Sequence, residues 1–474
     1  MIKNLKLFLL VVFQGCFFCG YPQNLHLQFD HIGTASGLSI SNVQSIVQDS
    51  RGFMWFGTTD GLNKYDGYRF TVYKNDPADS NSLTNNYLRS IAKSKNGDLW
   101  VATLGGGVCR YNHNKEHFER YRHNPKNINS ITDDNVNAVL EDEEGNVWIG
   151  TSTGLDMLEQ KTKKFVHFLS LKDNKNTLSV NNVKNIFEDC KHNLWIATVN
   201  GGINLFNRKY KTFTRFMHDE KNPASISSNN IITIFEDSEM RLWLGTDGAG
   251  MDYLDRQTGV FHHYKKDENN ANSLAANAVY AFNEDTDKNL WIGTENGGLS
   301  VFNIKSDSFI TYKNDEIDRE SISNNSLYAI FRDNKNNMWI GNYSSGIDMY
   351  NSDKGSFVHY KHMQQKSSLS NNSVLCIFED SKQNIWIGTD GGGLDLFNAA
   401  SGQFTHFKHD KNNNQSICGN YVLSTIEDSK GKIWIGTWAD GITVYDPIGK
   451  TYRHFKNDPE DPASINSNNV WKNF

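Results

Sequence analysis

The sequence predicts an all-β chain in which small four-stranded antiparallel sheets stand around an axis as the blades of a β-propeller. A tryptophan recurs nine times in nearly the same short phrase, at spacings of 45 to 48 residues, and repetition at this period is typical of propeller blades. Each unit also contains four apolar segments of strand length. Such a unit is too small to bury both faces alone, so neighbouring units must stack. The tryptophans are Trp55, Trp100, Trp148, Trp195, Trp243, Trp291, Trp339, Trp386 and Trp434.

The fifth unit shows how each strand is recognised. Its four expected strands are residues 231–235, 242–245, 251–254 and 260–264, which are rich in β-branched and aromatic side chains. Asp, Ser and Gly residues separate them, as expected of hairpin turns. Because the apolar segments are nearly continuous, both faces of each sheet should be covered.

The phrase around each tryptophan predicts how neighbouring sheets meet. Strand alternation places Trp243 and Gly245 on one face of the sheet, and Leu242 and Leu244 on the other. We expect the glycine to let the next sheet approach closely, while the indole fills the widening gap toward the rim. The tryptophans should therefore be packing residues and not a surface for ligands.

A carboxylate recurs after the first strand of eight units. Equivalent sites in successive blades are spread around a ring, so these groups should not converge on a metal ion or a catalytic centre. We interpret them as turn caps that accept hydrogen bonds from backbone amides two residues on. The second unit has Ser94 instead, and the carboxylates are Asp49, Asp142, Asp189, Asp237, Asp285, Asp333, Asp380 and Asp428.

The segment before the first unit predicts how the ring closes. Residues 25–31 resemble the fourth strand of a unit that has no partners of its own. Pairing with the first three strands of the seventh unit would close a seven-bladed ring over residues 23–352 and leave no bare sheet edge. Residues 353–474 would then begin a second, incomplete propeller, with residues 357–360 as its unpartnered strand. A single nine-bladed ring is the alternative.

The chain termini carry further expectations. Lys3 and Lys6 precede a short apolar stretch, so residues 1–22 are expected to be an export signal, with Cys16 as a less fitting lipidation site. No later apolar run approaches the roughly 20 residues of a membrane-spanning helix. Residues 469–474 match the start of a tenth unit, as expected of a truncated reading frame or a fragment.

Charge and composition argue against several kinds of binding partner. The net charge is −6 with both signs interspersed, which argues against nucleic acid as a partner. No cysteine or histidine spacing suggests zinc, so no metal or cofactor is expected. Fourth-strand histidines such as His262, His263 and His406 are interpreted as lying on a solvated strand face.

Residues 377–394 carry the motif that is most specific to a family. An acidic turn is followed by Ile-Trp-Ile-Gly-Thr and then by Gly-Gly-Gly-Leu. This pattern, present in all nine units, resembles the two-component-regulator propeller repeat. The resemblance implies an exported periplasmic region of a hybrid two-component sensor that detects glycan fragments. Longer relatives add a second complete propeller, a sandwich, a membrane helix and a histidine kinase.

The resemblance implies that the kinase regions of a longer protein are partners of this chain. The chain itself shows no phosphoacceptor or nucleotide-binding motif. We therefore expect no enzyme activity and no catalytic residues in this chain. A propeller enzyme, such as a lyase or glycosidase, and a protein-binding scaffold are the alternatives. An enzyme should break the repeat with a cluster of acid, base or metal-binding residues, whereas the departures here are single aromatic residues.

Loops between the second and third strands, and between units, should share one face of the ring. We expect a ligand there, because most of these loops have small or polar tips and two place an aromatic residue instead. An aromatic ring beside carboxylates and amides suits a sugar. The rings could instead cap the central channel or pack on the next domain. The candidates are Asp60, Asn200, Asp247, Glu295, Asn296, Tyr343, Asp390 and Trp438.

Overall fold

The computed structural model describes residues 27–351, 360–363, 367–399 and 401–471. The predicted export signal, including Cys16, lies outside these residues, as do positions 357–359 of the expected strand 357–360. The chain divides into two compact units, Met1–Ser356 and Phe357–Phe474. Apart from one short 3-10 helix, η1 (Thr34–Ser36), the regular structure of the described residues is all β. No helix in the described ranges has the length and apolar character needed to span a membrane.

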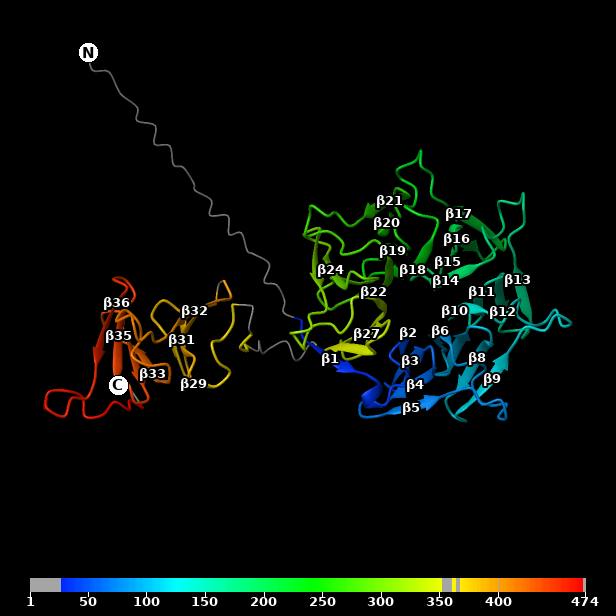
Figure 1. Cartoon of the computed structure of the whole chain (residues 1–474). Coiled ribbons are helices and arrows are strands. Elements are labelled where there is room, and N and C mark those ends of the chain that lie inside the picture. Colours follow the sequence, from blue (N-terminus) through cyan, green and yellow to red (C-terminus); the bar gives the residue numbers. More distant parts are fainter. Residues whose placement is uncertain (1–26, 352–359, 364–366, 400, 472–474) are drawn as a thin grey trace, which may run out of the picture. The chain divides into compact units, whose positions relative to one another are not determined.

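The first unit contains seven four-stranded antiparallel sheets arranged around a common axis (Figure 1). The first strand of each sheet is nearest the axis. These strands are β2 (Val43–Gln48), β6 (Leu88–Lys93), β10 (Val136–Glu141), β14 (Val183–Glu188), β18 (Ile231–Glu236), β22 (Val279–Glu284) and β26 (Leu327–Arg332). The second strands, which carry the tryptophans, are β3 (Met54–Thr58), β7 (Leu99–Thr103), β11 (Val147–Thr151), β15 (Leu194–Thr198), β19 (Leu242–Thr246), β23 (Leu290–Thr294) and β27 (Met338–Asn342).

The outer half of each sheet completes the pattern. The third strands are β4 (Gly61–Tyr65), β8 (Gly107–Asn112), β12 (Leu155–Leu158), β16 (Gly202–Asn207), β20 (Met251–Asp255), β24 (Leu299–Asn303) and β28 (Ile347–Tyr350). The fourth strands are β5 (Phe70–Tyr73), β9 (His117–Tyr121), β13 (Phe165–Phe168), β17 (Thr212–Phe216), β21 (Val260–Tyr264), β25 (Ser308–Tyr312) and β1 (Phe29–Ile32). The strands expected in the fifth unit agree with the observed bounds to within one residue.

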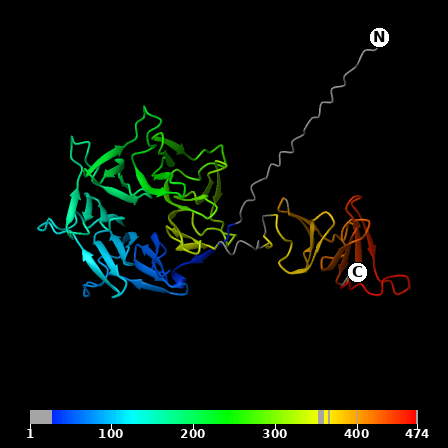
Figure 2. The ribbon, with the colours of Figure 1, turned by 180° about the vertical axis from the view of Figure 1, so that it is seen from behind.

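The amino-terminal strand β1 completes the last sheet of this unit. It pairs antiparallel with β28, with Phe29 opposite Tyr350 and Ile32 opposite Ile347, so the strand order is β1-β28-β27-β26. The first sheet then packs on this one through a shared core that contains Val43, Phe56 and Trp339. Within the first unit, seven sheets thus follow one another around the axis, with β1 as the fourth strand of the last one (Figure 2).

The tryptophan and glycine of each phrase lie between adjacent sheets. Eight of the nine indoles are buried, with exposed fractions of 5% or less, and Trp243 packs against Val279 and Ile292 of the next sheet. A β-carbon on Gly245 would lie 2.6 Å from the Val279 carbonyl oxygen. The glycine therefore permits the close approach, as predicted. Trp434, in the last sheet of the chain, is only half-buried.

The recurring aspartates cap turns, as predicted, and also hold the indoles. Asp237 accepts the backbone amide of Glu239 at 3.0 Å, and its second oxygen accepts the Trp243 indole N–H at 2.8 Å. In the second sheet, where Ser94 replaces the aspartate, the Trp100 indole donates instead to Glu141 at 2.9 Å. These carboxylates are thus engaged in structure.

The second unit contains two further sheets of the same design. Their strands are β29 (Val374–Glu379), β30 (Ile385–Thr389), β31 (Gly393–Asn398) and β32 (Gln403–Phe407), then β33 (Val422–Glu427), β34 (Ile433–Thr437), β35 (Ile442–Asp446) and β36 (Thr451–Phe455). After β36 the chain returns to β34, where the Val470 amide donates to the Thr437 carbonyl at 3.0 Å. This contact matches the expected start of a tenth unit.

Candidate ligand site in the axial channel

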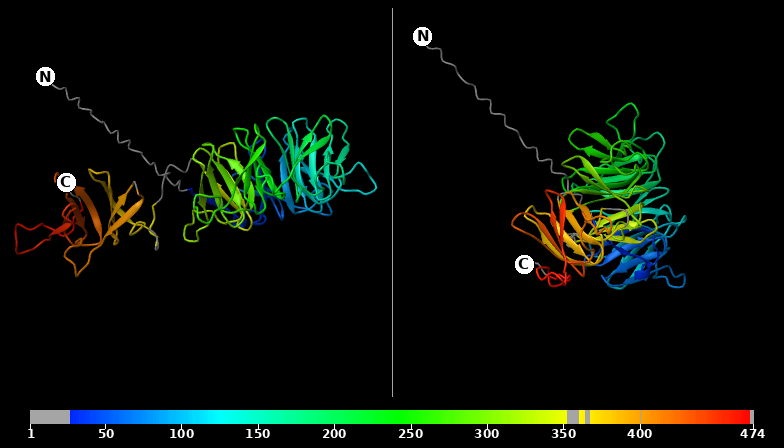
Figure 3. Two further views of the ribbon diagram at one scale, coloured as in Figure 1. Left: turned by 90° about the horizontal axis from the view of Figure 1, so that it is seen from above. Right: turned by 60° about the vertical axis from the view of Figure 1, so that its left-hand side comes forward.

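The first unit encloses a cavity along its axis. Its volume is about 460 Å³, and residues from the first strands of all seven sheets line it. Tyr343 joins them from the loop between β27 and β28. Figure 3 shows the unit edge-on, with loops on both faces of the ring. The cavity thus gathers side chains from every blade of this unit at one place.

A β-bulge in each first strand supplies the most variable side chains of the channel. Val43 and Ser45 pair with the consecutive residues Thr58 and Gly57, so Gln44 is the extra residue of the bulge. The same register shift recurs in all seven sheets, and every bulge residue lines the channel. Bulges commonly redirect a side chain next to a functional site. We call these positions the bulge ring: Gln44, Arg89, Asn137, Lys184, Ile232, Tyr280 and Tyr328.

Three tyrosines form a continuous aromatic surface on one side of the channel. Tyr280 stacks on Tyr328 with ring centroids 4.7 Å apart, and Tyr328 meets Tyr343 edge-on at 5.4 Å. The Tyr343 ring is 51% exposed, so it remains accessible to a ligand. The Tyr280 hydroxyl donates to Glu295 at 3.5 Å. Burial, followed by the negative charge of Glu295, raises the pKa of Tyr280, so its hydroxyl stays protonated as a donor near neutral pH.

Two cations of the bulge ring face the same cavity. The guanidinium of Arg89 lies over the Tyr87 ring, 5.0 Å from its centroid. Burial and then the positive charge of Arg89 lower the pKa of Lys184, and the carboxylate of Asp247 opposes this effect. The lining residues include no aspartate or glutamate, so the channel wall itself is cationic.

The structure brings three of the predicted site residues to this region. Tyr343 lines the channel, and Glu295 accepts the hydrogen bond from Tyr280. Asp247 accepts a hydrogen bond from the Asn230 side chain at 3.0 Å and raises the pKa of Tyr280 through its charge, after burial and Glu295. Tyr343 is thus part of the aromatic surface, and Glu295 and Asp247 act on Tyr280 within it.

The other predicted residues lie elsewhere or have local contacts. Asp60 forms an ion pair with Lys74 at 2.6 Å. Asn200 and Asn296 occupy left-handed turn positions, with φ of 58° and 61°, where asparagine is favoured for its backbone conformation.

Asp390 and Trp438 belong to the second unit. Trp438 is 45% exposed and meets Trp471 edge-on, with ring centroids 5.1 Å apart. Asp390 accepts the Asn371 side-chain amide on its backbone carbonyl at 2.7 Å. Their role in binding stays a prediction.

Sequence reasoning missed the bulge ring as a set. The signal was present, because the second residue of each first strand varies from Gln to Arg, Lys, Ile and Tyr while the preceding residue stays apolar. A bulge depends on how two strands pair, so the alternation of residues within one strand does not reveal it.

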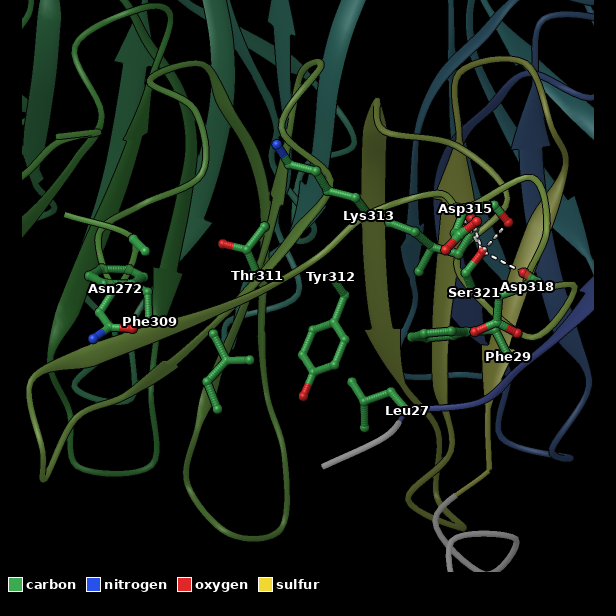
Figure 4. A pocket seen from close by; sticks show the side chains of 13 residues that line it. Leu27, Phe29, Asn272, Phe309, Thr311, Tyr312, Lys313, Asp315, Asp318 and Ser321 are labelled. Carbon is green, nitrogen blue, oxygen red and sulfur yellow. Dashed lines mark hydrogen bonds between the residues drawn. The ribbon is translucent and has the colours of Figure 1, made fainter. Parts of the chain in front are cut away.

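A second cavity, of about 430 Å³, lies between β25 and the segment around Leu27 and Phe29 (Figure 4). Its polar side is formed by a loop in which the Ser321 hydroxyl bonds to the backbone of Asp315 and Asp318. These bonds serve the fold of the loop itself. Among the residues described, no group of three or more His, Cys, Asp or Glu side chains is arranged to hold a metal ion. The axial channel, which side chains from all seven sheets line, is the candidate site.

Comparison with known proteins adds a family model and several relatives. The model described as "two component regulator propeller" matches residues 37–60, 82–105, 130–153, 225–248, 273–296, 321–344, 368–391 and 416–439. A protein named histidine kinase P4, from Formosa agariphila, is 39% identical over 83 residues, which cover 18% of this chain and 6% of that protein.

Solved structures give the same picture at the level of the fold. The extracellular domain of the putative hybrid two component system BT3049 from B. thetaiotaomicron is 26% identical with a TM-score of 0.76, covering 92% of this chain and 57% of that one. The corresponding domain of BT4673, at 23% identity and a TM-score of 0.56, covers 89% and 59% and is similar in fold. Virginiamycin B lyase from Staphylococcus aureus, at 14% identity and a TM-score of 0.51, covers 68% and 98% and shares the fold alone. The chain thus spans little more than half of the sensor domains that it matches.

Proposed function

Because the chain belongs to the two-component regulator propeller family, we propose that it is the ligand-sensing region of a hybrid two-component sensor and recognises glycan fragments in the periplasm. In this proposal, ligand binding is passed to a histidine kinase encoded in a longer protein. The similarity to the extracellular domain of a putative hybrid two component system supports the sensor role. It leaves the choice of ligand to the chemistry of the site.

The aromatic surface of Tyr280, Tyr328 and Tyr343 carries the proposal that the ligand is a sugar. Sugar rings present apolar C–H faces that pack on aromatic rings, while their hydroxyl groups need polar partners. The channel provides both, since amide side chains such as Asn137 and Asn185 line the same cavity as the tyrosines. A cavity of about 460 Å³ is large enough for a short oligosaccharide.

Binding without turnover fits the same cavity better than glycoside hydrolysis does. Glycosidases use a pair of carboxyl groups that flank the scissile bond. The residues that line the channel include neither Asp nor Glu. The likeness to a lyase concerns the fold alone, and therefore gives no support for an enzyme.

Replacing Tyr343 by alanine tests the site. We expect roughly tenfold weaker binding of an oligosaccharide, or ~1.4 kcal/mol, because the most exposed of the three stacking rings is lost. Thermal stability should change little, since Tyr343 is 51% exposed. A panel of soluble oligosaccharides is first screened by thermal shift, and the affinity of the best binder is then measured by calorimetry.

Tyr210→Ala is the matched control, because Tyr210 is a 66% exposed tyrosine in the turn between β16 and β17, away from the channel. It should leave the affinity unchanged. Equal affinity of wild type and Tyr343→Ala would remove Tyr343 from the site, and failure of every oligosaccharide to bind would contradict glycan sensing.

A further inference from the structure

Arg89 and Lys184 are two bulge-ring cations without an anionic partner. Both line the axial channel, on β6 and β14. Within the described part of the chain, neither side chain forms an ion pair, and the buried Arg89 Nε has no hydrogen-bond partner. The Arg89 guanidinium forms a cation–π contact with the Tyr87 ring. The two groups are also close enough for the charge of Arg89 to lower the pKa of Lys184.

Leaving a partly buried cation unpaired is unfavourable, because water no longer solvates the charge fully. Two half-buried arginines between neighbouring sheets of the same unit are paired with carboxylates. Arg208 contacts Asp142 and Glu188, both at 2.7 Å. Arg256 contacts Asp189 at 2.9 Å and Glu236 at 2.7 Å in the next interface. Arg89 and Lys184 thus differ from these two arginines, each of which has two carboxylate partners.

The local charge of the channel also departs from that of the whole chain. The chain has a net charge of −6, yet the channel wall has two cations and no carboxylate. Asp247 is the acidic group whose charge acts on Lys184, and it is held by Asn230 without forming an ion pair with the lysine. Low-dielectric walls strengthen the field of the two cations inside the cavity, which attracts an anion.

We propose that the axial channel binds an anionic sugar, whose carboxylate or sulfate group is held by Arg89 and Lys184 while its ring packs on the tyrosines. This inference rests on the proposed glycan-sensing function and specifies its substrate class. Arginine presents a planar fork of N–H donors that matches the oxygen atoms of either anion, and lysine adds a second positive charge. The aromatic surface supplies the apolar contact within the same cavity.

The test measures calorimetric affinities of the full chain for three probes: oligogalacturonate as the carboxylate, chondroitin sulfate oligosaccharide as the sulfate ester, and cello-oligosaccharide as the neutral sugar. We expect one or both anionic probes to bind at least tenfold more tightly than the neutral probe. Raising NaCl from 50 to 300 mM should weaken anionic binding severalfold, because salt screens the attraction. This salt dependence needs no variant and therefore does not depend on how a variant folds.

Arg89→Gln and Lys184→Gln should each weaken binding of the anionic probe at least tenfold, and Arg89→Lys should restore part of the loss. Lys93→Gln is the matched control, because Lys93 is exposed on the same strand β6 and does not line the channel. Its affinity should equal that of wild type.

The outcomes distinguish failure of the anionic site from failure of the proposed glycan-sensing function. Equal binding of neutral and anionic probes, or anionic binding that is unchanged in both Arg89→Gln and Lys184→Gln, would overturn the anionic site while glycan sensing stands. If none of the three probes binds and wider oligosaccharide panels also fail, the proposed function itself is wrong. Preference between the first two probes identifies the anion as carboxylate or sulfate.

Discussion

A single glycine in the second strand of most sheets sets how closely two neighbouring sheets can pack. Gly150, Gly245, Gly341 and Gly388 all have side-chain or backbone atoms of the next sheet within 3.0 Å of where a β-carbon would lie. Distances this short are not seen for real β-carbons, so a methyl group would force the sheets apart. The second and fourth sheets hold Ala102 and Ala197 at this position, which shows that the spacing is adjusted sheet by sheet.

Gly245→Ala should lower the free energy of unfolding by about 1–3 kcal/mol, because the new methyl group would lie 2.6 Å from the rigid Val279 carbonyl oxygen. Denaturant unfolding of the full chain measures the change. Gly33→Ala is the control, since its backbone is extended and a β-carbon there would meet nothing within 4 Å. A loss of the same size in both variants would show that close packing at Gly245 is not the cause.

At this scale the sequence predicts structural residues better than ligand-binding ones. The indoles, glycines and capping aspartates repeat, so their packing roles could be inferred from one unit. Arg89 and Lys184 do not repeat, and they reach the channel through a bulge that depends on the pairing of two strands. Tyr343 could be identified because it replaces a small or charged residue found in the sibling loops.

The strand β1 is the element that completes the last sheet, and one side-chain pair links it to its neighbour. His31 Nδ1 on β1 lies 2.7 Å from a carboxylate oxygen of Asp348 on β28. The same pair joins the fourth and third strands of other sheets, at His167 with Asp156 and at His263 with Asp252. His263 and His406 are exposed, which agrees with the interpretation that fourth-strand histidines lie on a solvated strand face. Each also contacts a buried carboxylate at 2.7 Å, of Asp252 and Asp395 respectively, which the sequence did not predict.

The stability that the His31–Asp348 pair gives to the last sheet should depend on pH. The hydrogen bond to Asp348, despite partial burial, raises the pKa of His31 above its usual value. A raised folded-state pKa means that the pair stabilises the fold fully below about pH 6.5 and loses this contribution as pH rises through the folded pKa. We expect about 1 kcal/mol or less, because the His31 side chain is 35% exposed and solvent screens the pair.

Thermal midpoints of wild type and His31→Gln at pH 5.5 and pH 8.5 provide the measurement. The variant should be less stable at pH 5.5 and nearly equal to wild type at pH 8.5. His262→Gln is the control, because His262 stacks on Tyr253 and forms no ion pair with the described residues. A difference between wild type and His31→Gln that does not change with pH would contradict the ion pair.

The sequence predicted this element from its resemblance to a fourth strand, at residues 25–31, and the observed strand is Phe29–Ile32. The type of strand was predicted correctly but its bounds were not, and this difference has a physical reason. Residue type indicates which strand position a segment can fill, whereas the hydrogen-bonding partner β28 decides where pairing begins.

At the scale of the whole chain, the two units differ in how completely their sheets are covered. Val43 and Ile46 of β2 are 0% and 8% exposed, whereas their counterparts Val374 and Ile377 of β29 are 39% and 68% exposed. Each sheet of the first unit has a neighbouring sheet on both faces. The apolar face of β29, in contrast, is left partly exposed by the described residues. Stability should therefore be concentrated in the first unit.

Limited proteolysis should trim the chain back to near Asn351 and leave the first unit as the resistant core. The reason is that the seven sheets of the first unit pack on one another through shared cores, whereas two sheets are present among the described residues of the second unit. Mass spectrometry of the fragments locates the cut, and the trimmed protein should keep the main thermal transition of the full chain. A product that resists cleavage at its full length would contradict this expectation.

The organisation of the chain into repeated sheets was predictable, because each unit repeats the same local rules of turn, strand and packing. The choice between seven sheets and nine was not decided by the sequence, since both closures satisfy the rule that no edge is left bare. The pairing of β1 with β28 is the kind of contact that sequence patterns do not reveal, because it brings together segments more than 300 residues apart.

The bulge ring has an evolutionary consequence. Each of its seven positions is carried by a separate copy of the same small sheet, so duplication, shuffling or point change of one copy alters one contact with the ligand and leaves the others in place. Ligand preference can thus diversify by recombination of these repeated sheets, while the propeller fold that holds them is inherited unchanged.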